Sequence, residues 1–454
     1  MTEWLDAALS YATRWLDYQM QQTQLPGCVL AVAKNGNLIL ERAYGVSDLA
    51  TGEPLTPRHR FRVASHSKTF TAAGIMKLRE QGRLHLDDNV GAYVTGLHVD
   101  VASATISQLL SHSAGIMRDG TQAPHWMVRE PFFDRAKLFD ELAKPLAIEG
   151  NTRFKYSNVG YGLLGQVIEA ISGEPYGVWI EREVVKPFGL SETTHDTPST
   201  GVPLAAGHSA RIPFGRGRIE GHQATHALAA ATGFTSTAAD LARFFSLLYP
   251  KVPTSALSPA SRKEMTRRHW SVIGGGEPRH YGLGVIGMDI GKHALFGHAG
   301  SFPGFISRTS VVEANGISLT IVTNAVDGFA NAWVEGIVSI FNIFEKYGKP
   351  EERLADWALR LWSLWGALDL VPAGDKVLFT DPGALRPLTD HGEITVQVDG
   401  SAHISKANGF GSFGEPVRRC YAPDGGLQQV LMGGNGMLAN ASDLAIHPLQ
   451  SASI

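Results

Sequence analysis

The first part of the chain changes from a helical to an alternating pattern of apolar residues. Residues 3–22 carry one apolar stripe at helical spacing, which predicts an amphipathic helix. Apolar runs at 28–34 and 37–44 follow, and between them stands Asn35-Gly36, the pair typical of a two-residue hairpin turn. The pattern therefore predicts a helix followed by an antiparallel hairpin.

The middle of the chain, about 85–270, alternates helical runs with loops and shows little strand pattern. Strand-like runs then return at 281–288, 293–297, 305–312 and 317–324, and a helix is expected at about 329–346. Strands at both ends of a helical region predict one antiparallel sheet, flanked by helices and built from both ends of a domain, with an all-helical subdomain packed against it.

The pattern changes again near Lys349-Pro350. An apolar stripe with Trp357, Leu361 and Trp365 predicts a linker helix over 349–369. Short alternating runs after it predict a small antiparallel, barrel-like β domain. The expected fold class is α/β (α+β). The expected domains are 1–348 (sheet subdomain about 1–60 and 271–348, helical subdomain about 61–270), the linker helix 349–369, and the β domain 370–454.

The composition and charge of the chain argue against several classes of function. The chain has 454 residues, of which 44% are hydrophobic and 18% charged, as in a soluble globular protein. A net charge of −3 gives no electrostatic footprint for nucleic acid. No apolar stretch is long enough to span a bilayer, and no signal peptide is visible, so we expect a cytoplasmic protein without a membrane partner. Cys28 and Cys420 have no CxxC neighbour, which argues against a disulfide framework.

One predicted helix carries a serine and a lysine among apolar residues. Lys68 is the only formally charged side chain between Val63 and Met76. A buried lysine is costly unless it is paired or has lost its proton. The i, i+3 spacing brings its amine close to Ser65, which is how a weak nucleophile can be activated. The simpler interpretation is a helix cap and a surface charge.

Two further segments have matching chemistry. A phenol beside a lysine, as at Tyr156, can accept a serine proton, and Asn158 offers both a donor and an acceptor. The small residues after His298, including Gly300 and Ser301, let a strand edge approach a substrate closely. The simpler interpretations are a tyrosine packed at a helix entrance and a strand-end turn with a partly exposed histidine.

These segments together resemble the serine β-lactamase and penicillin-binding-protein-like superfamily, in particular its class C, D-aminopeptidase and esterase branch. The resemblance covers roughly residues 10–345. The segments that carry it are Ser65-His66-Ser67-Lys68, Tyr156-Ser157-Asn158 and His298-Ala299-Gly300, with supporting matches at 109–115, 161–165 and 235–241. It implies an α/β sheet domain beside a helical domain, with a catalytic cleft between them.

The resemblance also implies roles for the residues. Ser65 would be the acylated nucleophile, and Lys68 and Tyr156 would share the base and acid roles, with either one as the base. Asn158 would position the lysine and the substrate. The oxyanion hole would be formed by the backbone N–H groups of Ser65 and Ser301. No cofactor is implied.

His298 departs from a common pattern of the family. Many β-lactamases and D-Ala-D-Ala peptidases carry a lysine there, which helps to bind a substrate carboxylate, whereas histidine is mostly neutral near pH 7. The expected function is thus a serine hydrolase of a small amide, peptide or ester, with a D-residue as one option. The alternatives are a peptide-cyclising or acyl-transfer enzyme, a weak β-lactamase or DD-peptidase, and a non-catalytic binding protein.

Weaker signals concern substrate binding and assembly. His222 and His226 have a metal-compatible spacing, but no glutamate follows the first histidine, so we expect them to line the cleft and not to hold a metal. Arg218, in a basic loop, is a candidate for a carboxylate or peptide terminus. Gly300 is expected to contact substrate. The C-terminal domain would set substrate length, add stability or join two copies as a homodimer.

Overall fold

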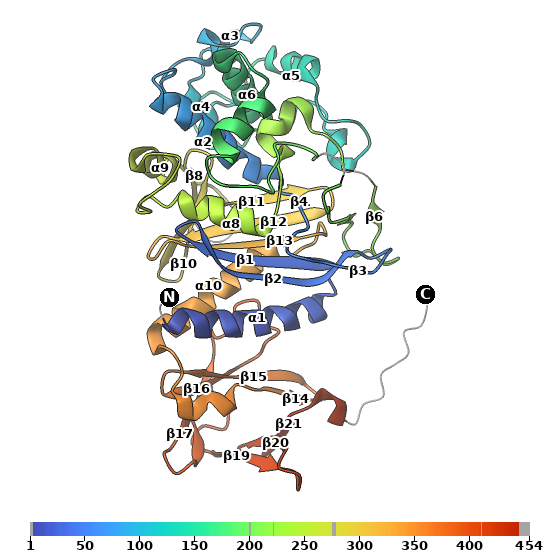
Figure 1. Cartoon of the computed structure of the whole chain (residues 1–454), viewed down its shortest axis with the longest axis vertical. Coiled ribbons are helices and arrows are strands. Elements are labelled where there is room, and N and C mark those ends of the chain that lie inside the picture. Colours follow the sequence, from blue (N-terminus) through green and yellow to red (C-terminus); the bar gives the residue numbers. More distant parts are fainter. Residues whose placement is uncertain (1–2, 199–200, 221, 275–277, 410, 445–454) are drawn as a thin grey trace. The chain divides into compact units, whose positions relative to one another are not determined.

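The computed structural model describes residues 3–198, 201–220, 222–274, 278–409 and 411–444, which belong to two compact units (Figure 1). One unit is Leu25–Val334, and the other combines Met1–Gln24 with Glu335–Ile454. The first holds an antiparallel sheet and a group of helices, and the second holds a closed barrel. These observations confirm the predicted fold class.

The sheet of the first unit is assembled from both ends of that unit, as predicted. Within the described residues nine strands hydrogen-bond in the order β3-β2-β1-β13-β12-β11-β10-β9-β8. The junction is the antiparallel pair β1 and β13, in register from Cys28 opposite Thr323 to Lys34 opposite Ile317. The strands are β1 Gly27–Lys34, β2 Asn37–Asp48, β3 Glu53–Pro54, β8 Trp270–Val272, β9 Arg279–Tyr281, β10 Ile286–Ile290, β11 His293–Phe302, β12 Phe305–Val312 and β13 Ile317–Thr323.

Local sequence signals set two of these features. Asn35 and Gly36 both adopt positive φ (53° and 79°), as a primed two-residue turn requires, so β1 and β2 form the predicted hairpin. The strand predicted at 281–288 is instead two strands, β9 and β10. Gly284 breaks the run because it adopts φ 73° and packs against the side chain of Ala72 and the backbone of Lys68.

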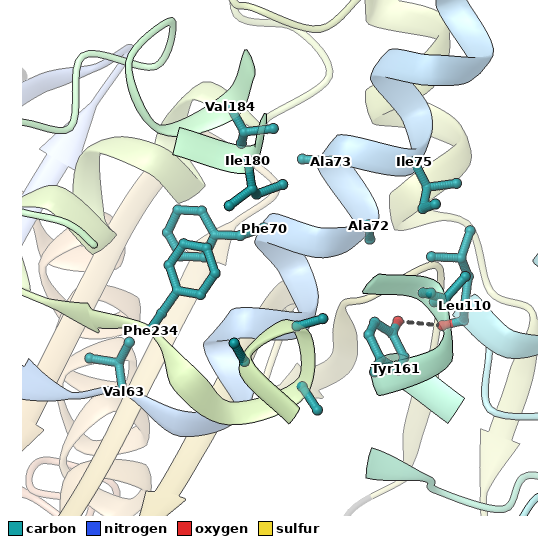
Figure 2. Packing of buried hydrophobic residues seen from close by; sticks show 14 of the residues in the cluster. Val63, Phe70, Ala72, Ala73, Ile75, Leu110, Tyr161, Ile180, Val184 and Phe234 are labelled. Atoms are coloured by element: carbon teal, nitrogen blue, oxygen red, sulfur yellow. Dashed lines mark hydrogen bonds between the residues drawn. The ribbon is translucent and has the colours of Figure 1, made fainter. Parts of the chain in front are cut away.

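The helices of the first unit gather mainly beside the sheet (Figure 1). Phe70 of α2 stacks between Phe234 and Phe244, with ring centroids 4.3 and 4.1 Å away, and Figure 2 shows the first of these pairs. Helix α8, N-capped by Thr237, packs on β1 and β13. The helices are α2 Ser67–Glu80, α3 Val99–Ala102, α4 Ile106–Leu110, α5 Arg135–Leu142, α6 Asn158–Ser172, α7 Tyr176–Ile180, α8 Ala238–Leu247 and α9 Pro259–Thr266.

Shorter elements connect these helices. Two small ladders pair β4 with β7 and β5 with β6. Their bounds are β4 Phe61–Arg62, β5 Gly207–His208, β6 Arg218–Ile219 and β7 Thr235–Ser236. Single helical turns are η1 Ala64–His66, η2 Val90–Ala92, η3 Pro124–Met127, η4 Glu181–Val185, η5 His226–Leu228 and η6 Ala229–Gly233. The pair β4–β7 holds the chain just before Ser65.

The second unit is built on helix α1 (Glu3–Thr23) and an eight-stranded barrel. Buried Trp15 of α1 donates its indole N–H to the carbonyl of Ala384 over 3.2 Å, and Gln19 donates to the carbonyl of Pro382 over 2.7 Å. The barrel strands are β14 Arg360–Ser363, β15 Gly366–Ala373, β16 Lys376–Thr380, β17 Gly392–Val396, β18 Ala402–Lys406, β19 Pro416–Tyr421, β20 Leu427–Met432 and β21 Asn435–Leu438. Helix α10 (Ala330–Tyr347) leads into this unit, and short turns η7 Glu352–Trp357 and η8 Ala441–Asp443 lie near its ends.

The linker helix predicted over 349–369 is wrong. Only the turn η7 is helical there, and the barrel begins ten residues earlier than predicted, at Arg360. Leu361 is buried in the barrel, whereas Trp365 is 98% exposed at the turn before Gly366. Apolar residues four positions apart share one face of a helix and also one face of a strand, so this spacing alone did not separate the two.

No helix in the described part of the chain has the length and apolar character needed to cross a membrane.

Candidate active site

Ser65 lies in the turn η1, directly before helix α2. Ala64 adopts φ 45°, a left-handed conformation that an alanine rarely takes, and such strain is found most often at functional sites. Ser65 is half-buried, whereas His66 and Ser67 are buried. The hydroxyl of Ser65 is therefore held by a strained, densely packed turn.

Lys68 is completely buried one turn further along α2, as predicted. Its Nζ lies 3.3 Å from Ser65 Oγ, 2.6 Å from Asn158 Oδ1 and 2.8 Å from the carbonyl oxygen of Ala231. Burial lowers the pKa of Lys68 well below its usual value, and the carboxylate of Asp119 opposes this shift. The amine is thus fully coordinated and predisposed to lose its proton.

Tyr156 reaches Ser65 from the segment just before helix α6. Its hydroxyl donates to Ser65 Oγ over 2.7 Å, and the Lys68 ammonium lies 4.7 Å from its ring centroid. The exposed guanidinium of Arg118 lies over the same ring at 5.3 Å. Burial raises the pKa of Tyr156, while the hydrogen bond with Ser65 and the charge of Arg118 lower it. Burial thus favours the neutral forms of both Lys68 and Tyr156.

The N-terminus of α6 fixes the positions of Tyr156 and Asn158. Ser157 caps the helix, because its Oγ accepts the N–H of Gly160 over 2.8 Å. Asn158 is buried at the first helical position, where its Oδ1 accepts from Lys68 and its Nδ2 donates to Asp119 over 2.5 Å. Tyr156 and Asn158, which stand on either side of the capping Ser157, are therefore held in fixed positions next to Ser65 and Lys68.

Strand β11 closes the site from the sheet. Gly300 lies so close to the backbone of Val63 that a Cβ at this position would stand 2.1 Å from the carbonyl oxygen of Val63. Strand β10 pairs with β11 only as far as Gly297, so on that side the following residues have no strand partner in the described chain. Ser301 is exposed in this stretch. The structure thus brings the third motif next to the segment that precedes Ser65.

His298 is buried, in contrast to the partly exposed histidine of the simpler interpretation. Its Nε2 lies 2.9 Å from the hydroxyl of Tyr281, and its Nδ1 lies 2.7 Å from the carbonyl oxygen of Ala299. Burial lowers the pKa of His298 well below its usual value. The ring is therefore a neutral, fully bonded part of the wall and presents no cation to a substrate.

The substrate-binding roles of His222, His226 and Arg218 stay predictions. The structure gives none of His222, His226 or Arg218 a hydrogen bond or ion pair with Ser65, Lys68, Tyr156 or Asn158 among the described residues. His222 stacks on Phe305 with ring centroids 6.0 Å apart, and burial lowers its pKa to about 4. The other two are exposed, and Arg218 pairs with Asp48 at 3.2 Å.

The two histidines do not share a helix face, since the turn η5 begins only at His226. Across the described ranges, no group of three or more histidine, cysteine, aspartate or glutamate side chains is arranged to hold a metal ion.

Sequence reasoning missed two residues of this site. His112 is buried and packs on Tyr156 with ring centroids 4.2 Å apart, and its Nδ1 accepts the N–H of Ser157 over 3.1 Å. It stands in the segment 109–115, which sequence alone marked only as a supporting match. Asp119 contacts Asn158 from a loop, and a single acidic residue in a loop gave no signal of its own.

The sequence of this chain is similar to those of several known proteins. The model of the Beta-lactamase family matches residues 12–335. Protein flp of Staphylococcus aureus strain MRSA252 is 30% identical over 187 residues, which is 39% of this chain and 36% of that protein. A putative D-alanyl-D-alanine carboxypeptidase of Escherichia coli O157:H7 is 28% identical over 204 residues, 41% of this chain and 46% of that protein. The matched region thus spans less than half the length of these curated relatives.

One solved structure with a similar fold is the D-amino acid amidase from Ochrobactrum anthropi SV3 complexed with D-phenylalanine. It superposes with a TM-score of 0.64 at 24% identity, covering 74% of this chain and 99% of the amidase. At this identity the likeness establishes a shared fold.

Proposed function

This chain belongs to the Beta-lactamase family, and we propose that it is a serine hydrolase that forms an acyl-enzyme on Ser65. The observation that carries the proposal is the arrangement around one hydroxyl: Tyr156 donates to Ser65 Oγ over 2.7 Å, and Lys68 Nζ lies 3.3 Å from the same oxygen. A nucleophile that touches both a base and an acid is what acyl transfer to serine requires.

We assign the base role to Lys68. A neutral amine has two N–H donors and one lone pair. The two acceptors closest to Nζ, Asn158 Oδ1 and the carbonyl of Ala231, would take the two N–H groups. The lone pair would then face the hydroxyl of Ser65, and burial favours this neutral form because it lowers the pKa of Lys68.

The reaction would proceed in two halves. Ser65 Oγ would attack the substrate carbonyl while its proton passes to Lys68, and the N–H groups of Ser65 and Ser301 would bind the oxyanion. Tyr156 would give its proton to the leaving amine or alcohol and recover one from Lys68. Water would then attack the ester on Ser65 by the reverse sequence, releasing the acid and the free serine.

The proposed substrate is a small amide, short peptide or ester whose acyl part is a D-residue. The supporting observations are the names of two similar proteins: one relative is a putative D-alanyl-D-alanine carboxypeptidase, and one protein with a similar fold is a D-amino acid amidase. His298 argues against substrates that need a cation at that position, because it is buried and its burial-lowered pKa keeps it neutral. Efficient β-lactam or DD-peptide hydrolysis is therefore not expected.

A matched substrate panel tests this proposal. We expect kcat/KM for D-aminoacyl amides and esters to exceed kcat/KM for their L-enantiomers and for a penicillin. The Ser65→Ala variant should lose turnover of every substrate. Turnover that survives in Ser65→Ala would refute the nucleophile, whereas a preference for L-substrates would refute only the substrate class.

A further inference from the structure

Asp119 links the candidate catalytic residues to a loop of the helical subdomain. Its Oδ1 accepts from Asn158 Nδ2 over 2.5 Å and from the indole N–H of Trp126 over 3.1 Å. Its Oδ2 lies 2.9 Å from Nε of Arg118. The Asp119 side chain is only 15% exposed, so its carboxylate is shielded and bonded on both oxygens.

The backbone around Asp119 is itself bonded to the start of α6. The carbonyl of Met117 accepts from Ser157 Oγ over 2.7 Å, and the carbonyl of Arg118 accepts the N–H of Asn158 over 2.8 Å. Three successive loop residues therefore bond to the N-cap and the first residue of α6, Ser157 and Asn158. The distance between Asp119 and Asn158 is set by this backbone and does not depend on the side chains alone.

The chemistry of Asp119 determines how the Asn158 amide is oriented. An ionised carboxylate can only accept hydrogen bonds, so the atom of Asn158 that faces Asp119 must be the nitrogen. The oxygen then faces Lys68, where it can only accept. With the amide reversed, Asn158 would point its N–H groups at the N–H groups of Lys68. Its oxygen would face the Asp119 carboxylate, and neither of these two acceptors could donate to the other.

We propose that Asp119 is a positioning residue for acylation of Ser65: it holds the Asn158 amide so that the amide oxygen takes one N–H of Lys68 and the lysine lone pair faces the Ser65 hydroxyl. This inference rests on the proposed function, since it assigns Lys68 as the base. It adds a residue that touches neither Ser65 nor the amine and acts through Asn158.

The charge of Asp119 gives the proposal a second, independent readout. Asp119 is the carboxylate that opposes the burial-induced lowering of the pKa of Lys68. The other titratable or charged groups that face Lys68 come from every side of the site: Arg118, Tyr156, Tyr161, His112 and His298. The burial-lowered pKa values of the two histidines keep them neutral, and the pKa values of the two tyrosines are raised. Removing the Asp119 carboxylate would thus lower the pKa of Lys68 further.

Two substitutions separate orientation from charge. Asp119→Ala removes the acceptor, and kcat should fall roughly 10- to 100-fold with little change in KM, the loss expected for a hydrogen bond to a charged group. Asp119→Asn retains an acceptor oxygen without the charge. It should recover most of kcat, while the acid limb of the kcat/KM pH profile moves to lower pH because Lys68 loses its proton more readily.

The control is Asp140→Asn, which removes an exposed carboxylate of α5 in the same subdomain and should leave kcat and the profile unchanged. If circular dichroism shows that Asp119→Ala does not fold, the kcat/KM pH profile of Asp119→Asn serves as the test of the proposal. An acid limb at the wild-type position in Asp119→Asn, or wild-type kcat in folded Asp119→Ala, would overturn the positioning role. Turnover retained in Ser65→Ala would instead overturn the proposed function on which it rests.

Discussion

Gly300 of strand β11 lies against the carbonyl of Val63, two residues before the candidate nucleophile, with no room for a Cβ between them. A Cβ at position 300 would also stand 2.5 Å from Oγ of Ser307 on the neighbouring strand β12, so β11 can lie this close only because residue 300 is a glycine. This contact sets the spacing between Ser65 and Ser301, whose N–H groups are the proposed oxyanion donors. A small residue at 300 is therefore a condition of the site and not only of the fold.

Gly300→Ala should lower kcat/KM about 100-fold, because a displacement near 1 Å between reacting groups costs on that order. The measurement is kcat/KM on the best substrate of the panel, with thermal unfolding to establish that the variant folds. Ser301→Ala is the matched control on the same strand. It keeps the backbone N–H and should lose less than about threefold, far below the 10²- to 10³-fold cost of losing an oxyanion donor.

Lys68→Arg tests whether the amine acts as a base or only as a positive charge. A guanidinium stays protonated in proteins, so it keeps the charge and cannot take the proton of Ser65. We expect kcat for Lys68→Arg and for Lys68→Met to fall alike, by about 10²- to 10⁴-fold. The loss would be measured as the rate of single-turnover acylation by rapid quench. A Lys68→Arg enzyme much faster than Lys68→Met would contradict the base role.

Folding stability should fall on mild acidification because several histidines are buried in neutral form. Burial lowers the pKa of His66 to about 3 and lowers the pKa values of His112 and His298 as well. In the unfolded chain these groups titrate near 6.5, so below that pH the unfolded state binds more protons. Each histidine should then cost up to about 1.4 kcal/mol per pH unit between about pH 6.5 and pH 5.

The measurement is the unfolding free energy from urea titrations across this window, above the range in which most carboxylates titrate. His66→Gln retains polar atoms but cannot take a proton, so its stability should depend less on pH. His85→Gln replaces an exposed histidine and should follow the wild-type curve. A His66→Gln curve as steep as that of the wild type would show that His66 does not carry this dependence.

Features that depend on neighbouring residues were predictable from the sequence. The turn at Asn35-Gly36 is set by local backbone preferences, so the hairpin was predicted correctly. The buried state of Lys68 followed in the same way from the apolar residues around it on α2. Local context thus predicted both the hairpin and the burial of the lysine beside Ser65.

Features that depend on contacts between distant segments were not predictable. Asp119 meets Asn158 across 39 positions of sequence, and nothing near Asp119 marks it as different from a solvated loop acid. His298 is buried in contact with Tyr281 of another strand and with His66 of the turn η1. At Trp365 an apolar stripe fitted a helix equally well, but the pairing of β14 with β15 places this residue at the tip of a hairpin.

Acylation of Ser65 can be read out by peptide mass spectrometry of the labelled protein. After treatment with a fluorophosphonate or a D-aminoacyl ester, we expect one adduct, on the peptide that contains Ser65. Ser65→Ala should acquire none, and Ser67→Ala, which alters the buried neighbouring hydroxyl, should still acquire it if folded. An adduct on another residue, or labelling that persists in Ser65→Ala, would show that Ser65 is not the nucleophile.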